Sequence, residues 1–159
     1  MTGYGILDTD GFRHSYVTSG FLSIEGEDLP QRLGMIFQEV SRVIEEWRPE
    51  TMAIEQVFVN RNVDSALKLG QARGAAICAG VHARLPVDEY TPRAIKKAVI
   101  GTGAADKQQI QQMMQKLLGL EQKLQSDEAD ALAIAMCHAN HSHVRKIGIV
   151  HGSRRGRWV

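Results

Sequence analysis

Two acidic segments that lie far apart in the sequence carry side chains suited to metal chemistry. The stretch "SDEADALAIAMCHA", residues 126–139, places Asp127 and Asp130 three positions apart before an apolar run. In a helix this spacing puts both carboxylates on one face. Two buried carboxylates cannot both stay ionised without a cation, and Mg²⁺ prefers such oxygen ligands. A simpler alternative is that the acids favour the positive end of a helix, by about 0.3–1 kcal/mol each, with Ser126 or Asp127 as the N-cap.

A third carboxylate, Glu55, interrupts the apolar segment "TMAIEQVFV". Strand alternation puts it on one face with Ala53 and Val57. It is therefore either a solvated charge on an edge strand or a carboxylate at the carboxyl end of a central strand, where open α/β sheets bind ligands. The three histidines of "HANHSH" lack cysteine or acidic partners, which argues against a transition-metal site there. With the two aspartates, Glu55 would form an acidic cluster suited to metal-assisted phosphoryl transfer.

The elements that must position these acids alternate between strands and helices. Apolar periodicity and turn residues predict antiparallel strands within 3–24, a helix within 28–50 that Pro49 ends, further helices over about 62–84, 91–99, 106–118 and 127–140, and buried strands over 51–59 and 85–90. A meander followed by helices that alternate with single strands predicts an α/β domain. We expect a mixed sheet covered by helices on both faces.

Length and composition indicate one ordinary globular domain, over 1–140, followed by a basic and flexible tail over 141–159. Of the 159 residues, 43% are hydrophobic and 23% charged, and no apolar run approaches the roughly 20 residues that cross a bilayer. We expect a cytoplasmic protein without a secretory leader and without a membrane partner, in which Cys78 and Cys137 are buried free thiols. Residues 145–159 carry five basic and no acidic residues, so this end either lies along phosphates or only aids solubility.

The helix expected over 62–84 carries a stripe of small residues, Ala66, Gly70, Gly74 and Cys78, at four-residue intervals. Each interior glycine costs about 0.8–1 kcal/mol relative to alanine. Close approach of another element would offset that cost. The element is either part of the same chain or a second copy across a two-fold axis.

Several motifs together resemble the RuvC-type crossover junction endodeoxyribonucleases, the bacterial Holliday-junction resolvases. The similar stretches are "TGYGIL", "AIEQVFVNRNVDSALKLGQARGAA", "VIGTGAADKQQIQ" and "DEADALAIA", in register from Thr2 to about His141. The resemblance implies a ribonuclease H-like fold with a mixed five-stranded sheet. It also implies a homodimer that cuts four-way junction DNA by paired symmetric nicks in recombination and repair. The implied cofactor is Mg²⁺, two ions per subunit and replaceable by Mn²⁺, and the implied partner is a branch-migration helicase complex.

The resemblance also assigns roles to single residues. Glu55, Asp127 and Asp130 match three of the four carboxylates of the family that hold the metal ions and are catalytic. Lys107 is the residue that would steady charge in the transition state. Phe58 matches an aromatic residue that meets the bases of the junction, where stacking is worth about 1–3 kcal/mol per base.

Four positions match residues that lie near the DNA backbone in the family. Lys96 and Lys107 carry point charges suited to phosphate. Gly101 and Gly103 would let the backbone approach DNA just before a helix N-terminus.

One departure from the family pattern concerns the N-terminus. The family has a strand with an I-D-P-G-type motif, which carries its first catalytic aspartate, before T-G-Y-G, whereas this sequence opens with Met1-Thr2-Gly3-Tyr4. We therefore expect the first strand of the sheet to be truncated. Either translation starts upstream, so that Met1 occupies an internal position, or the chain is a non-catalytic dimer that binds junction DNA.

Overall fold

The computed structural model describes residues 2–58 and 63–150, the last eight without their side chains. No helix in these ranges combines the length and the apolarity that a membrane crossing requires. In chain order the elements are β1 (Thr2–Thr9), β2 (His14–Leu22), α1 (Leu29–Trp47), β3 (Met52–Glu55), α2 (Val63–His82), β4 (Val87–Tyr90), α3 (Pro92–Ile100), α4 (Lys107–Leu118) and α5 (Ser126–Val150).

The strands of the described residues form two separate pairs. β1 and β2 make an antiparallel hairpin with an irregularity after Ile6. β3 and β4 run parallel, from Met52 opposite Val87 to Glu55 opposite Tyr90. The expected mixture of antiparallel and parallel pairing is present. A single five-stranded sheet is not formed, because within residues 2–58 and 63–150 no ladder joins the two pairs. A truncated sheet agrees with the expectation for the first strand.

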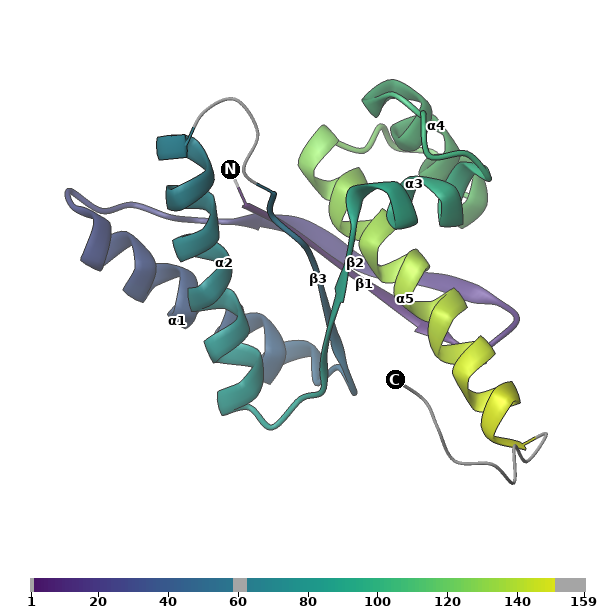
Figure 1. Cartoon of the computed structure of the whole chain (residues 1–159), viewed down its shortest axis with the longest axis horizontal. Coiled ribbons are helices and arrows are strands. Elements are labelled where there is room, and N and C mark those ends of the chain that lie inside the picture. The colour runs from purple at the N-terminus through teal and green to yellow at the C-terminus, as the bar shows by residue number, and fades with distance from the viewer. Residues whose placement is uncertain (1, 59–62, 151–159) are drawn as a thin grey trace.

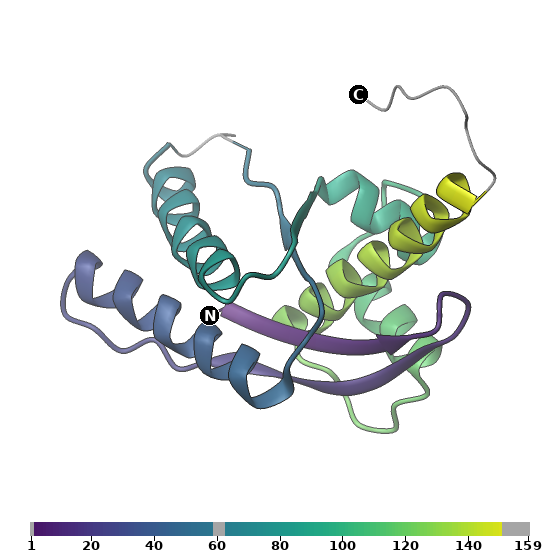
Figure 2. The same cartoon turned by 90° about the horizontal axis from the view of Figure 1, so that it is seen from below.

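Helices cover the strands from two sides. α1 and α2 lie together on one side, and α3, α4 and α5 lie on the other (Figure 1). The view from below shows α5 running along the β1–β2 hairpin while α1 and α2 pack against each other (Figure 2). The prediction that helices flank the strands on both faces is confirmed.

The apolar core gathers around α5. Its largest fully buried side chains are Met114 from α4, Leu124, and Leu132 and Cys137 from α5. Burial raises the pKa of the Cys137 thiol to about 11, so this thiol stays protonated. Both cysteines are free, as expected, but Cys78 is exposed. The prediction that it is buried is wrong, because this residue lies on the outward face of α2.

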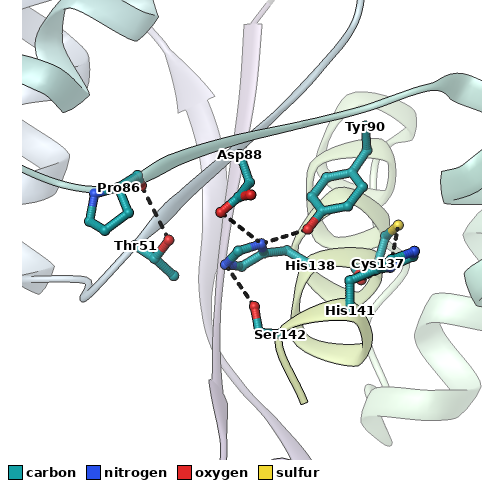
Figure 3. A network of polar contacts seen from close by, with 8 residues as sticks. All are labelled: Thr51, Pro86, Asp88, Tyr90, Cys137, His138, His141 and Ser142. Carbon is teal, nitrogen blue, oxygen red and sulfur yellow. Dashed lines mark hydrogen bonds and ion pairs between the residues drawn. The ribbon is translucent and has the colours of Figure 1, made fainter. Parts of the chain in front are cut away.

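A polar network ties α5 to β4 (Figure 3). The Tyr90 hydroxyl and the Asp88 carboxylate lie 3.0 Å and 3.8 Å from Nδ1 of the buried His138. Ser142 Oγ lies 3.3 Å from Nε2 of the same ring. A buried polar group that lacks a partner costs about 1–3 kcal/mol, so these contacts favour one position of α5 against β4. His138 thereby has a packing role.

Two glycines of β1 lie where α5 crosses the strand. A Cβ on Gly3 would collide with the backbone oxygen of Asp127, and one on Gly5 would lie 2.7 Å from the Leu132 side chain. Real Cβ atoms essentially never come within 3.0 Å of a neighbour. Because residues two apart on a strand share a face, the T-G-Y-G spacing places both glycines under the helix. The strand therefore fixes where α5 begins.

α5 continues past residue 140, where we expected the tail to begin. The helix runs to Val150, so residues 141–150 of the expected tail are helical. The segment "HSHVRKIGIV" has no proline, and its one glycine costs only about 1 kcal/mol, which does not end a helix. Residues 151–159 lie outside the described part of the chain.

We predict that Gly3→Ala destabilises the fold by about 1–3 kcal/mol, the usual cost of overpacking a close contact. The matched control is Gly34→Ala in α1, where a new Cβ would meet nothing within 4 Å. This control should gain roughly 0.5–1 kcal/mol, because alanine is the better helix former. Urea unfolding followed by circular dichroism measures both. Equal midpoints for Gly3→Ala and the unmodified chain would contradict the close contact.

Candidate active site

A cavity of about 300 Å³ lies where β3, α3, α4 and α5 meet. Its charged lining residues are Glu55, Lys96, Lys107 and Asp130, one from each of these elements. The rest of the lining is apolar and comprises Pro92, Ile95, Ile110, Ala133 and Ile134. An apolar cavity with a few convergent polar groups is the usual form of a small-molecule or catalytic site. The cavity brings together four residues that the sequence analysis had selected.

Glu55 is the last residue of β3, so it lies at the carboxyl end of a strand. The final rung of the ladder follows it directly, since the Gln56 N–H donates to the Tyr90 carbonyl at 2.8 Å. The strand is shorter than the apolar segment suggested, so Val57 lies beyond it. Within the described residues β3 pairs with β4 alone.

The start of α5 is capped by residues other than the expected ones. The first intrahelical hydrogen bond ends on the carbonyl of Gln125, so the prediction of Ser126 or Asp127 as the N-cap is wrong. One oxygen of Glu128 accepts from the Gln125 N–H at 3.0 Å, which is the reach-back of a capping box. The other oxygen accepts from Ser19 Oγ of β2 at 3.1 Å. Glu128 thus fixes the helix start that carries the two aspartates.

The two aspartates of α5 differ in their surroundings. Asp130 lines the cavity, whereas Asp127 does not. No group of three or more His, Cys, Asp or Glu side chains within the described ranges is arranged to hold a metal ion. The predicted three-carboxylate cluster is therefore incomplete. Asp127 precedes Asp130 by three residues, so it lies about 4.5 Å from Asp130 along the helix axis, nearer to the close contact with Gly3.

The electrostatics of the cavity act on Glu55. Partial burial by the cavity walls raises the pKa of Glu55, and the Asp130 carboxylate raises it further, while Lys107 and Lys96 act against both. Lys107 Nζ lies 3.6 Å from Asp130 Oδ2, with the lysine 75% and the aspartate 42% exposed. An exposed pair of this kind contributes at most about 1 kcal/mol to stability. Its main effect is on the charge balance of the cavity.

Lys107 occupies a helix position that does not favour a cation. It is the first residue of α4, whose N-cap Asp106 forms a capping box with Gln109. A positive charge in the first turn opposes the helix dipole by roughly 0.3–1 kcal/mol. Helix stability therefore does not explain the lysine, which lies beside Asp130 at the cavity.

The other residues predicted to meet DNA lie outside the cavity lining. Phe58 follows the end of β3 and is 60% exposed, as its prediction required. Gly101 has φ 85° and ends α3, where its N–H donates to the Lys97 carbonyl. A Cβ on Gly103 would lie 2.7 Å from the Arg93 side chain. Helix termination and packing are sufficient reasons for these two glycines.

The sequence analysis missed Arg73 of α2, which contacts the candidate site from outside. Its Nε–H donates to the backbone carbonyl of Glu55 at 2.9 Å, and its Nη2 lies 2.6 Å from Glu89 Oε2. One signal was present in the sequence, since no other charged residue occurs between Lys68 and His82. A long cation alone in an apolar helix indicates a partner.

The sequence pattern and the fold of this chain match those of known RuvC proteins. The pattern of the family described as Crossover junction endodeoxyribonuclease RuvC matches residues 1–138. The RuvC of Photobacterium profundum is 52% identical over 161 residues, which cover 99% of this chain and 92% of the relative. That of Methylococcus capsulatus is 55% identical over 141 residues, which cover 89% and 85%.

Solved structures agree with the sequence matches. Thermus thermophilus RuvC superposes with a TM-score of 0.80 at 32% identity, over 90% of this chain and 89% of that one. The same protein in complex with a Holliday junction substrate gives 0.82 at 33% identity, over 90% and 88%. This likeness confirms the expected α/β, ribonuclease H-like fold. Since the family pattern also spans every residue that lines the cavity, the chain belongs to the RuvC family of crossover junction endodeoxyribonucleases.

Proposed function

We propose that this chain is a structure-specific endonuclease that resolves Holliday junctions by paired symmetric nicks, through metal-dependent hydrolysis of DNA phosphodiesters. The observation that carries this proposal is the cavity in which Glu55 and Asp130 meet Lys96 and Lys107. A relative with the same fold was solved with a Holliday junction substrate, which supports four-way DNA as the substrate. The proposed setting is DNA recombination and repair in the cytoplasm, in partnership with a branch-migration helicase complex.

Mg²⁺ is the proposed cofactor, with two ions per subunit and Mn²⁺ as a substitute. The donor set fits, because two carboxylates share one cavity and the pKa of Glu55 is raised partly by Asp130. A hard divalent cation would let both stay ionised. Glu55 and Asp130 would hold the metal, with Asp127 as the third proposed ligand. When bound, the ions would activate water and stabilise the leaving oxygen.

The chain's own side chains would bind and orient the DNA. Lys96 and Lys107 place ammonium groups in the cavity, where they can pair with the phosphate to be cut. Lys107 would also offset the charge that develops on that phosphate in the transition state. Phe58 presents an exposed ring beyond the strand end, on which a base of the junction can stack. Gly101 and Gly103 are proposed to let the backbone follow the DNA closely.

We further propose that two copies pair through α2. One stripe on α2 has members that recur every three or four residues along the helix. Its exposed members are Val63, Leu67, Cys78 and Val81, and its partly exposed members are Gly70 and Gly74. The three large members are 60–65% exposed, and a Cβ on Gly70 or Gly74 would meet no described atom within 4 Å. Packing within the described chain therefore does not offset the cost of these glycines. A second copy of α2 would cover the stripe and approach closely at the glycines.

A second candidate function is a dimer that binds junctions without cutting them. The incomplete carboxylate cluster in the described part of the chain favours it. Such a protein would keep the lysines and Phe58 as DNA contacts and lack turnover with any metal.

A nicking assay on a synthetic four-way junction with Mg²⁺ separates the two candidates. We expect the chain to nick opposite strands symmetrically and to leave linear duplex of the same sequence intact. Asp130→Asn should reduce the rate by about 1000-fold, because it removes several kcal/mol of metal-ligand interaction. Glu121→Gln, an exposed residue outside the cavity lining, is the matched control and should nick normally. Retained junction binding without nicks by the unmodified chain would instead establish the second candidate.

The charge balance of the cavity predicts a pH effect of Lys107→Met. Loss of this cation removes an influence that lowers the pKa of Glu55, so the pKa should rise further. A larger share of Glu55 is then protonated at a given pH, and the acid limb of the cleavage profile moves to higher pH. Carboxyl NMR of the metal-free protein measures the pKa directly. Lys96→Met should give a shift in the same direction but smaller, and an unchanged pKa in Lys107→Met would contradict the described contacts.

The proposed dimer predicts different effects for two equal substitutions in α2. Leu67→Glu should dissociate the dimer, because it places a charge on the stripe. Leu69→Glu is the matched control, since Leu69 is similarly exposed, at 58% against 61%, but points away from the stripe. Light scattering on the eluting protein measures the mass. A dimeric Leu67→Glu, or a monomeric unmodified chain at micromolar concentration, would reject this surface.

A further inference from the structure

Arg73 joins α2 to the ends of both parallel strands. Its Nε–H donates to the Glu55 carbonyl at 2.9 Å, and its Nη2 pairs with Glu89 of β4 at 2.6 Å. The arginine side chain is 21% exposed, so much of it is withdrawn from water. A guanidinium is a planar fork with fixed donor directions. Two partners held at once therefore fix the end of β3 relative to the end of β4.

Arg73 acts from the face of the strand pair that lies away from the cavity. Glu55 stands opposite Tyr90 in the ladder, and Tyr90 packs against α5. Successive strand side chains point to opposite faces, so Glu89 points away from α5 and toward α2. The arginine thus contacts the main chain of Glu55 from behind, while the Glu55 carboxylate faces the cavity.

The Glu55 carbonyl has no ladder partner in β4. In a parallel ladder the groups of alternate residues point to the two edges of a strand. Since the Gln56 N–H points to β4, the preceding carbonyl points to the opposite edge, where Arg73 donates to it. Removal of this donor would leave the last residue of a four-residue strand held on one edge only.

We infer that Arg73 is a positioning residue for Glu55, which sets the direction of its carboxylate through the backbone and so tunes the metal affinity of the site. The inference rests on the proposed metal-dependent function. Glu89 holds the second arm of the fork and offsets its charge.

Metal binding without DNA is the first test, with Mn²⁺ as the probe, read by its electron paramagnetic resonance signal. Arg73→Ala should weaken Mn²⁺ binding by about 10–100-fold, the usual effect of losing a group that orients a metal ligand. Arg73→Lys keeps one donor and should recover part of the affinity. Arg42→Ala is the matched control, because Arg42 also holds two partners, here the acidic side chains of Glu39 and Glu46, but on the surface of α1.

Hydrogen exchange of the Gln56 amide is the second readout and needs neither metal nor cleavage. It should speed up in Arg73→Ala at a temperature where circular dichroism shows the variant to be folded, while amides in the β1–β2 hairpin stay protected. Junction affinity in EDTA should change by less than about twofold, since Arg73 lies behind the site. Unchanged Mn²⁺ affinity, or a general loss of protection across all strands, would overturn the inference.

The same variants separate this inference from the proposed function. If the unmodified chain binds Mn²⁺ but never nicks a junction, the proposed function fails, and the Arg73→Ala effect on Mn²⁺ still tests the positioning role. If the unmodified chain nicks and Arg73→Ala shows the same Mg²⁺ dependence of the rate, the positioning role fails alone.

Discussion

α5 lies so close to β1 that a single methyl group on Gly3 would strike the backbone of Asp127. The same helix accepts a hydrogen bond from Ser19 of β2 through Glu128, and it contacts all four strands. No ladder joins the two strand pairs within the described residues. The contacts of α5 with both pairs therefore help to set their relative position. The position of Asp130 relative to Glu55 is therefore a consequence of glycine packing on a different pair of strands.

The cavity is electrically balanced before any ligand arrives. Two carboxylates, Glu55 and Asp130, face two ammonium groups, Lys96 and Lys107. Burial and like charge oppose ionisation of Glu55, while the lysines favour it. A divalent cation and a phosphate bring charges of both signs into the cavity. The cation would contact the carboxylates in place of the lysines, and the phosphate would contact the lysines in place of the carboxylates. Such a site exchanges the contact between Lys107 and Asp130 for contacts with its ligands, which limits the desolvation cost of binding.

Local signals in the sequence were enough to locate the helices and strands and to place Glu55 in one of the strands, because apolar periodicity acts over a few positions. The ends of several elements differed, since β3 stops at Glu55 and α5 continues to Val150. Features that depend on contacts between distant parts of the chain could not be predicted from the sequence. Whether Cys78 is buried depends on which face of α2 turns inward, and the α5 cap depends on where the Glu128 carboxylate reaches. Arg73 was not predicted as a site residue because its partner at the site is the main-chain carbonyl of Glu55. The type of a residue gives no information about such main-chain contacts. The lysines and Phe58 were selected through family resemblance and not from their spacing.

The separation of the strands into two pairs has a consequence for the motions of the molecule. Proteins open in cooperative units, and elements joined by backbone ladders tend to open together. Here the hairpin and the parallel pair are candidates for two such units, with α5 packed against both. Glu55 belongs to one unit, whereas α5, which carries Asp130, lies closest to the other at Gly3 and Gly5. A partial opening of the parallel pair would therefore separate Glu55 from Asp130.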